Sequence, residues 1–369
     1  MNASRNMSTK RISCIVSTKR RIMLISRADG TRGPLGVARA VNAWLADRPD
    51  CRMVEVGGGA GMLRLLASIA LRLRGWSICI HANGYRVPLL MHLVSCINRS
   101  NRYFCVMHGV VNVESAYRPV ERRDTRLEPY IFKNFQNVIC VSDFERRELF
   151  AMYGERNRVC VVHNGVDIPR GMEQPQRKAA RLALLEPVTC ITTGGFEQCK
   201  AVDLALEVLG HLSKLGRSAK LIVCGRDSVE TGSNRALCEQ LATDAGVELV
   251  YEGEIEDKAR LRELYAQAHF YVGLSRFDTF NVSVLEGAAV GCVPVISTFC
   301  GAAELFDSGS AIIVDINNPA ALDTAAERMA ALASDDIAYE QQSCAARRVA
   351  QANTWDYVAQ RYWEILSNG

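Results

Sequence analysis

The chain has 369 residues, more than one ordinary hydrophobic core holds, and this length fits two domains of usual size. Hydrophobic residues make up 49% of it and charged residues 23%, which is typical of a soluble globular protein, and no apolar run reaches the roughly 18 residues of a membrane-spanning helix. The 14 cysteines include no C-x-x-C pair and lie mostly in apolar runs. They indicate buried thiols in a reducing compartment, and neither a zinc site nor a disulfide framework.

The charge is distributed unevenly. Residues 1–170 contain 27 Lys and Arg against 13 Asp and Glu, the remainder is acidic, and no acidic residue lies between Val56 and Val113. This basic half predicts an anionic partner, either a lipid surface or a polyanion, unless its charges are merely spread over a solvated surface.

The first 20 residues are basic and lack a continuous apolar segment, so we expect 1–20 to be disordered and not a cleaved secretory signal. From there strand-like runs alternate with helical patterns. Strands are expected near Ile22–Ser26, Met53–Val56, Ser77–His81, Tyr103–Met107, Val138–Val141, Val159–His163, Thr189–Thr193, Lys220–Cys224, Glu248–Tyr251, His269–Val272, Val293–Ser297 and Ala311–Val314. Helices are expected near Gly36–Leu45, Met62–Leu73, Val87–Ile97, Asp143–Met152, Val202–Lys214, Asn234–Ala245, Lys258–Ala266, Asn281–Val290 and the terminal WDYVAQRYWEIL.

This alternation predicts an α/β fold with two parallel, doubly wound sheets. We expect one domain over residues 21–170, a linker near Asp167–Lys178, and a second domain over 171–352. Open sheets of this kind bind ligands at the carboxyl ends of their strands, so the site is expected in the cleft between the domains.

Two segments of the first half have competing interpretations. The glycines of VEVGGGAG, Val54–Gly61, resemble the motif of S-adenosylmethionine methyltransferases, but no acidic residue follows before Glu114; a glycine-rich loop bordering the cleft is expected instead. MLRLLASIALRLRGW is amphipathic and contains three arginines. It either packs against the sheet or docks on an anionic membrane.

The segment Ser275–Glu304 contains two carboxylates, Asp278 and Glu286, on either side of an expected helix start. The free N–H groups of such a start suit a phosphate, and Glu286, one to two turns on, could accept hydrogen bonds from a hydroxyl-rich group next to it. Two carboxylates around an anion site suggest a sugar nucleotide, although a surface loop and an ordinary amphipathic helix would give the same pattern.

Several motifs in order resemble family 4 retaining glycosyltransferases. They are GPLGVARAV after the first strand, MHG after the fourth, ICVSDF…HNGVD over Ile139–Asp167, GGFEQCKAVDLALEVL, the Asp278–Glu286 spacing and the terminal TWDYVAQRYWEIL. The resemblance spans about residues 20–367 and implies the GT-B fold, two facing Rossmann-like domains with a terminal helix, 353–369, that crosses back to the first.

The resemblance also implies roles for single residues. Glu286 would hold the donor ribose, His108 and Asp278 would lie near the transferred sugar, and Lys200 would neutralise the leaving diphosphate. Gly36, Gly195 and the amides of Phe280, Asn281 and Val282 would line the donor site. His81 is a weaker candidate. The chain departs from the family pattern at Asp278, usually glutamate, at Gly195, usually arginine, and at Thr279 and Asn281, commonly glycines.

The resemblance thus implies a retaining hexosyltransferase that uses a UDP- or GDP-sugar without a metal or other cofactor, consistent with the absence of an Asp-x-Asp motif. Expected partners are an acceptor glycan or lipid-linked glycan and an anionic membrane, but no nucleic acid. Bacterial surface polysaccharide synthesis is the expected setting, at a cytoplasmic location on the inner face of the cell membrane. Alternatives are a GT-B sugar-nucleotide epimerase and a non-catalytic paralogue that binds a partner glycosyltransferase.

Overall fold

The computed structural model describes residues 20–27, 34–46, 48–56, 58–82, 84–168, 187–227 and 233–368. Apart from residue 20, the segment 1–20 that was predicted to be disordered, and most of the predicted linker, fall outside these ranges. The domain boundary at residue 170 therefore stays a prediction.

The first half is built on a six-stranded parallel sheet with the order β2-β1-β3-β4-β5-β6. All six strands were predicted, and the structure confirms them as β1 (Arg21–Arg27), β2 (Cys51–Val56), β3 (Trp76–His81), β4 (Arg102–Val106), β5 (Asn137–Cys140) and β6 (Val159–Val161). Every residue of the central strand β3 is buried, as expected when helices cover both faces of a parallel sheet.

The second half contains another six-stranded parallel sheet, with the order β12-β11-β10-β7-β8-β9. Its strands are β7 (Val188–Thr193), β8 (Ala219–Cys224), β9 (Glu248–Gly253), β10 (Phe270–Gly273), β11 (Val293–Ser297) and β12 (Ile312–Val314). Counted from β7, this is the 3-2-1-4-5-6 order of Rossmann folds, and the direction of winding changes between β7 and β10.

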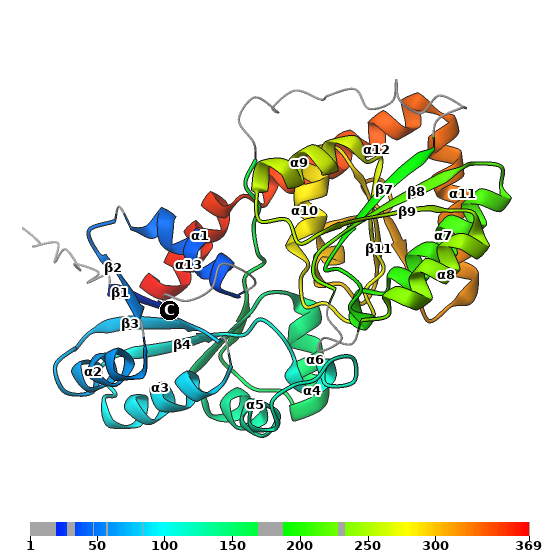
Figure 1. The fold of residues 1–369 in the computed structure, drawn as a ribbon. Coiled ribbons are helices and arrows are strands. Elements are labelled where there is room, and N and C mark those ends of the chain that lie inside the picture. The colour runs from blue at the N-terminus through cyan, green and yellow to red at the C-terminus, as the bar shows by residue number, and fades with distance from the viewer. Residues whose placement is uncertain are drawn as a thin grey trace, which may run out of the picture.

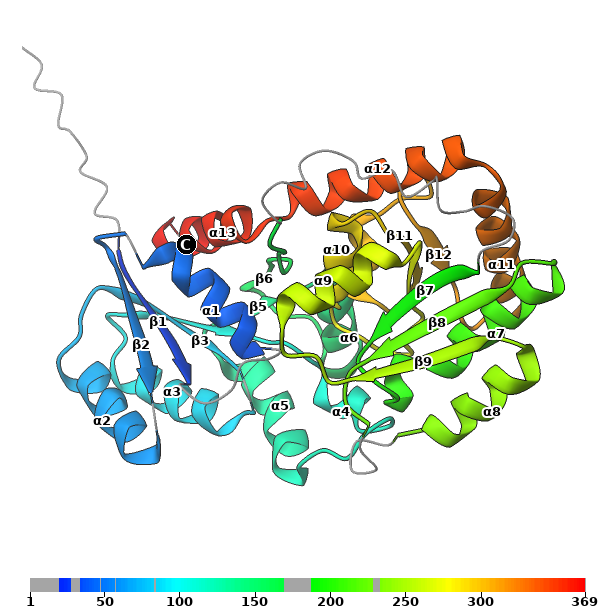
Figure 2. The ribbon, with the colours of Figure 1, turned by 45° about the horizontal axis from the view of Figure 1, so that its top comes forward.

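Helices cover both sheets (Figures 1 and 2). Those of the first half are α1 (Pro34–Leu45), α2 (Gly58–Leu71), α3 (Arg86–Ile97), α4 (Val111–Glu114), α5 (Arg122–Asn134) and α6 (Asp143–Tyr153). The second half has α7 (Val202–Lys214), α8 (Arg235–Ala245), α9 (Lys258–Gln267), α10 (Val282–Ala289), α11 (Pro319–Ser334), α12 (Asp336–Ala352) and the short 3-10 helices η2 (Gln198–Lys200) and η4 (Gly301–Leu305). Helices α4, α5, α11 and α12 were not predicted.

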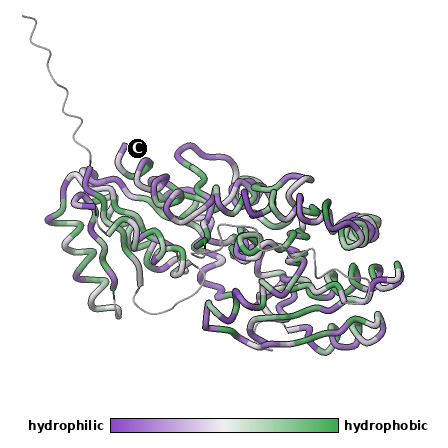
Figure 3. Tube along the Cα trace, turned by 90° about the horizontal axis from the view of Figure 1, so that it is seen from above, coloured by the Kyte–Doolittle hydropathy of each residue, from purple (hydrophilic) through white to green (hydrophobic). Residues whose placement is uncertain are grey.

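The last helix, α13 (Trp355–Asn368), returns to the first half and packs against α1, so that the red end of the chain lies beside its blue start in Figure 1. The helix was predicted, and Val358, Tyr362 and Leu366 lie on its buried side. One hydrophobic cluster joins these residues to Leu24 of β1 and also to Ile296 of the second half. The two halves lie side by side with hydrophobic segments running through both (Figure 3).

The predicted fold class is confirmed: two doubly wound parallel sheets whose strand ends face each other. Thr279, which follows β10, donates a hydrogen bond from Oγ1 to the carbonyl oxygen of His108, which follows β4, over 3.0 Å. The carboxyl ends of strands from both sheets therefore border the same space.

Candidate functional site

The site lies where the second sheet changes its direction of winding, because the loops after two neighbouring strands diverge there and leave a crevice. The loop after β7 leads to Lys200, and the loop after β10 leads to Asp278. Lys200 Nζ lies 2.6 Å from Asp278 Oδ2, and both side chains are largely buried. The structure thus brings together two residues that the sequence placed 78 positions apart.

This ion pair determines the protonation of Lys200. Burial is the largest single effect and disfavours the ammonium group, but the charge and hydrogen bond of Asp278, together with the nearby Cys199 and Tyr271, keep the pKa of Lys200 above its ordinary value. Lys200 is therefore a permanent cation at neutral pH. It lies in the crevice where an anionic ligand would be expected to bind.

The helix expected near Asn281 is α10, which begins at Val282. Asn281 precedes it with a left-handed φ of 59°, and its Oδ1 accepts a hydrogen bond from Tyr271 over 3.2 Å. Of the three amides proposed for an anion, that of Phe280 donates to Asp278 Oδ1 over 3.3 Å. Among the described residues, the amides of Asn281 and Val282 have no such acceptor, so they are the better candidates.

Glu286 lies one turn into α10 and accepts a hydrogen bond from Tyr265 over 3.1 Å. Burial raises the pKa of its carboxyl group above the ordinary value, while the hydrogen bond with Tyr265 acts in the opposite direction. The partly buried carboxylate lines the same space as Lys200 and Asp278. It is thus positioned to accept hydrogen bonds from a ligand that Lys200 also contacts.

Thr279 links the second half to the first through both its side chain and its backbone. Beyond its bond to His108, its own carbonyl oxygen accepts a hydrogen bond from Ser142 Oγ over 2.6 Å. Ser142 precedes α6 in the first half, so Thr279 is tied to that half at two points. A glycine at this position would keep the bond from Ser142 to the backbone carbonyl and would lose the side-chain bond to His108.

His108 and His81 form a pair in the first half. Nδ1 of His81 lies 2.9 Å from Nε2 of His108, and His81 Nε2 is buried without a hydrogen-bond partner among the described residues. Burial lowers the pKa of His81 to about 4. Burial also lowers the pKa of His108, and the neighbouring His81 lowers it further. Both rings are therefore neutral at pH 7.

The cleft between the halves consists of two adjoining cavities of about 750 and 1290 Å³, which share Lys200, Asp278 and Glu286 among other residues. His108 lines both, and Gly36 of α1 lines the larger. The volume is ample for a drug-sized or nucleotide-sized ligand. The structure thus gathers His108, Lys200, Asp278, Glu286 and Gly36 around one space.

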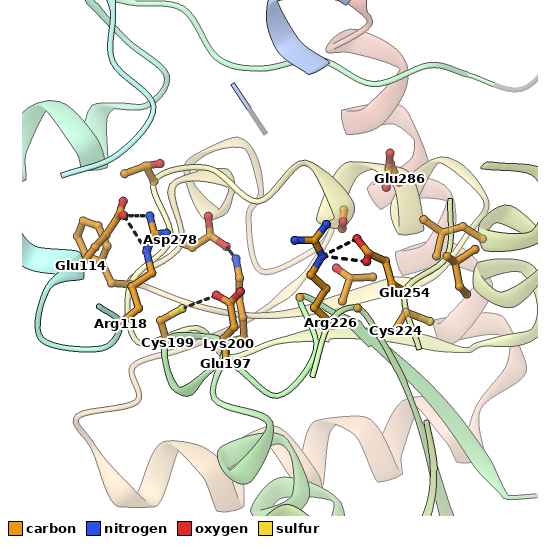
Figure 4. A pocket seen from close by; sticks show the side chains of 18 of the residues that line it. Glu114, Arg118, Glu197, Cys199, Lys200, Cys224, Arg226, Glu254, Asp278 and Glu286 are labelled. Atoms are coloured by element: carbon orange, nitrogen blue, oxygen red, sulfur yellow. Dashed lines mark hydrogen bonds and ion pairs between the residues drawn. The ribbon is translucent and has the colours of Figure 1, made fainter. Parts of the chain in front are cut away.

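Two charged pairs of the cleft were not predicted (Figure 4). Arg118 and Glu114, from the α4 region of the first half, form an ion pair at one end. Arg226, which follows β8, forms another with Glu254 at 2.8 Å. The position of Arg226 just beyond a strand end was a usable signal, whereas Arg118 lies in a loop without a recognisable pattern.

Among the described residues, the predicted glycine loop at the border of the cleft is not seen, and Gly57 lies outside them. β2 is an edge strand, α2 begins directly at Gly58, and neither Gly59 nor Gly61 lines either cavity. These glycines open a helix at the far edge of the sheet.

One group of side chains in the described ranges has metal-ligand chemistry. Ligand atoms of Asp143, His163 and Glu304 lie within 4.8 Å of one another. Arg146 pairs with Asp143, and Arg147 pairs with Glu304. Guanidinium groups thus already neutralise both carboxylates, and the expectation of a metal-independent site remains a prediction.

Two family models match the chain. "Glycosyltransferase Family 4" matches residues 23–170, and "Glycosyl transferases group 1" matches residues 187–332. Together these segments span most of the chain and correspond to its two sheets.

Among characterised proteins, the chain is 28% identical over 230 residues to a GDP-mannose-dependent alpha-(1-6)-phosphatidylinositol dimannoside mannosyltransferase of Mycobacterium tuberculosis. It is also 28% identical over 232 residues to a GDP-mannose:cellobiosyl-diphosphopolyprenol alpha-mannosyltransferase of Xanthomonas oryzae. The alignments cover 61% and 62% of this chain, but only 56% and 57% of those relatives. The chain therefore spans little more than half of their length.

Solved structures share the fold. HepE of Anabaena, in complex with UDP and glucose, superposes with a TM-score of 0.69 at 15% identity, covering 95% of this chain and 100% of that one. The sucrose-phosphate synthase of Thermosynechococcus elongatus gives a TM-score of 0.72 at 18% identity over 94% and 98% of the two chains. At these identities the likeness concerns the fold alone.

Proposed function

The chain belongs to the family 4 glycosyltransferases of the GT-B fold, and on this premise we propose that it is a retaining hexosyltransferase. It moves a hexosyl unit from a nucleoside-diphosphate sugar to an acceptor hydroxyl. The observation that carries this proposal is the arrangement of Lys200, Asp278 and Glu286 in one cleft at the switch point of the second sheet. A cation, two helix-start amides and a ribose-binding carboxylate match the parts of a sugar nucleotide.

Each part of the donor would have its own contacts. Glu286 accepts hydrogen bonds from the ribose hydroxyls, and Lys200 with the amides of Asn281 and Val282 neutralises the diphosphate as it leaves. His108 and Asp278 lie beside the hexose. Charge develops on the leaving diphosphate in the transition state, so fixed donors there lower the barrier.

Retention requires the acceptor to attack from the face that the diphosphate leaves. A phosphate oxygen on that face can take the proton of the acceptor hydroxyl while the glycosidic bond forms and the donor bond breaks. No protein nucleophile is then needed. The contribution of the protein is to hold both partners in the cleft and to stabilise the negative charge.

The relatives suggest which donor to test first. Both mannosyltransferases named above use GDP-mannose. We therefore propose GDP-mannose as the leading donor, ahead of UDP-sugars. Asp278 in place of glutamate is shorter by one methylene, which leaves more room beside the transferred sugar.

Incubation of the purified chain with UDP- and GDP-sugars, with and without a membrane extract, tests the proposal. Release of nucleotide that depends on the extract supports the transferase. Formation of an epimer without acceptor would instead identify the alternative epimerase. Failure of every nucleotide sugar to bind in calorimetry would contradict both enzymes and favour the non-catalytic paralogue.

The acceptor is proposed to be lipid-linked, with bacterial surface glycoconjugate synthesis on the cytoplasmic face of the membrane as the setting. Both relatives named above act on lipid-linked acceptors by their descriptions. Among the described residues, no helix is long and apolar enough to cross a bilayer. The chain would then reach such an acceptor by docking on the membrane surface.

The surface formed by α2 and α3 suits that docking. Leu63, Leu71, Leu93 and Ile97 are 61%, 72%, 50% and 71% exposed, and the two helices pack against each other. Exposed arginines accompany these side chains, namely Arg64, Arg72, Arg74, Arg86 and Arg99, and no acidic residue lies in this part of the sequence. Exposed apolar side chains among arginines fit the headgroup region of an anionic bilayer.

Vesicle sedimentation tests this surface. The chain is expected to bind vesicles that contain phosphatidylglycerol, to lose that binding in high salt, and to bind phosphatidylcholine vesicles weakly. Replacing Leu71 and Ile97 by serine should reduce binding, whereas replacing the exposed Leu237 of α8 by serine should not. Equal binding to both kinds of vesicle would contradict the electrostatic part of the proposal.

A further inference from the structure

The family's arginine position is occupied by Gly195, and the structure explains why no side chain fits there. Gly195 has a φ of 65°, and a Cβ at this position would overlap the backbone carbonyl of Arg226. The loops after β7 and β8 are paired at this point, since the amide of Gly195 donates to Cys224 over 2.9 Å. The backbone of Arg226 thus occupies the space into which an arginine at 195 would extend.

This close approach also places Arg226 next to Lys200. A Cβ on Gly194 would meet the side-chain carbons of Lys200 at 2.8–3.0 Å, while its neighbour Gly195 contacts Arg226. Consecutive Cα atoms are about 3.8 Å apart. The stem of Lys200 and the backbone of Arg226 therefore lie on either side of a two-glycine turn.

The side chain of Arg226 points into the cavity that Lys200 lines. Its Nε donates to both carboxylate oxygens of Glu254, at 2.9 and 2.8 Å, and its terminal nitrogens make no hydrogen bond to the described residues. The side chain is 67% exposed. In Figure 4, Arg226 lies between Lys200 and Glu286, with its free nitrogens directed away from Glu254.

We propose that Arg226 supplies the second cation for the diphosphate of the donor, in place of the arginine that Gly195 lacks. Glu254 holds one edge of the guanidinium group, so that its two terminal N–H groups face the cavity as a fork suited to phosphate oxygens. This inference rests on the proposed function, because it concerns the same donor site. It assigns the second positive charge at the diphosphate to the loop after β8 instead of the loop after β7.

Another guanidinium group lines the same cavity and provides the competing explanation. Arg118 enters from the first half, and both its Nε and Nη2 donate to Glu114. Two of its three nitrogens are thus already engaged by one carboxylate. Arg118 is the matched comparison, because it has the same charge and lines the same cavity from the opposite half.

Isothermal calorimetry with GDP, GMP, UDP and UMP tests the assignment. For the diphosphate that the wild type binds, Arg226→Gln is expected to raise Kd at least tenfold, and the loss for the corresponding monophosphate should be less than about threefold. Arg226→Lys should recover part of the affinity, because it keeps the charge and loses the fork. Arg118→Gln and Arg348→Gln, the latter exposed on α12, should bind like the wild type. Thermal unfolding of each variant verifies that it is folded.

The other outcomes are distinguishable. An unchanged diphosphate Kd in Arg226→Gln, or an equal loss for monophosphate and diphosphate, would overturn the assignment and leave the proposed function standing. A loss in Arg118→Gln instead would transfer the role to the first half. If the wild type bound none of the four nucleotides, the proposed function would fall, and this inference with it.

Discussion

The two sheets each have a switch point, and the two points differ in chemistry. In the first sheet the winding changes between β1 and β3, where His81 ends β3 and pairs with His108, and both imidazoles are neutral at pH 7. In the second it changes between β7 and β10, where Lys200 and Asp278 form an ion pair. The comparison shows that similar parallel topologies provide two crevices, and that the loops decide which crevice suits an anion.

This contrast assigns the two sides of the cleft to different parts of the reaction. A diphosphate needs fixed positive charge, which the second half provides through Lys200 and, by our proposal, Arg226. A hexose and an acceptor hydroxyl are uncharged, and neutral rings can hydrogen-bond to them without attracting competing ions. The predictions that follow change one side of the cleft at a time and so test this division.

The largest effect is expected for Lys200→Ala, which removes the cation of the second switch point. Turnover should fall about 100- to 1000-fold, or about 3–4 kcal/mol, because the developing charge of the leaving diphosphate loses a preorganised partner. The measurement is the rate of nucleotide release at saturating donor, and Lys214→Ala, exposed at the end of α7, is the control. Retention of full activity in Lys200→Ala would remove the basis for the charged side.

Gly195→Arg places the family's usual residue back at its position. It should destabilise the fold by about 2–3 kcal/mol without restoring any function, because the side chain would require a strained φ and displace the backbone of Arg226. Chemical denaturation of the variant and the wild type measures this. A variant as stable as the wild type, with higher activity, would show that the loops can separate and that Arg226 does not block this space.

Glu286→Ala should reduce activity at least tenfold, about 1.4 kcal/mol in the barrier, because the donor ribose loses its acceptor. Glu263→Ala, exposed on α9, should behave as the wild type. Steady-state kinetics over a range of donor concentrations measures the loss, and an unchanged rate in Glu286→Ala would refute the assignment of the ribose to Glu286.

The raised pKa of Glu286 adds a pH dependence. Only the ionised carboxylate accepts hydrogen bonds on both oxygens, so donor affinity should decline as pH falls from 7 toward the raised pKa. Glu286→Gln should bind more weakly at pH 7 and show a flatter acid limb in a calorimetric titration series. An acid limb identical to that of the wild type would attribute the titration to another group.

The smallest effect concerns the neutral side. Burial lowers the pKa of His81 to about 4 against an ordinary 6.5, so the unfolded chain binds more protons than the folded one between these values. The free energy of unfolding should therefore fall as pH drops through this window, by about 1 kcal/mol between pH 7 and 5.5. Urea denaturation at both values should show a weaker dependence for His81→Gln, and an unchanged dependence would contradict a neutral His81.

The sequence predicted the strands of both sheets well, because buried parallel strands are short apolar runs that are easily recognised. It missed α5, which is polar and has Pro129 in its interior, and also α11 and α12, whose buried positions include alanines and, in α12, the polar residues Gln342, Ser343 and Arg347. Helix α5 is nevertheless clearly amphipathic, so its periodicity was a usable signal.

The same limit applies to the site. Motif spacing located Lys200, Asp278 and Glu286, which local sequence can do. It gave no sign of the Lys200–Asp278 ion pair, of the bond from Thr279 to His108, or of Arg226 filling the space beside Gly195. These features arise where loops from different strands meet, and no short stretch of sequence contains both partners.

A crystal structure of the chain with GDP or UDP bound tests the division of the cleft most directly. We expect the diphosphate to lie against Lys200 and the amides of Asn281 and Val282, with the ribose hydroxyls on Glu286 and neither phosphate in contact with the two histidines. A nucleotide whose phosphates lay against His81 and His108 of the first half would contradict it.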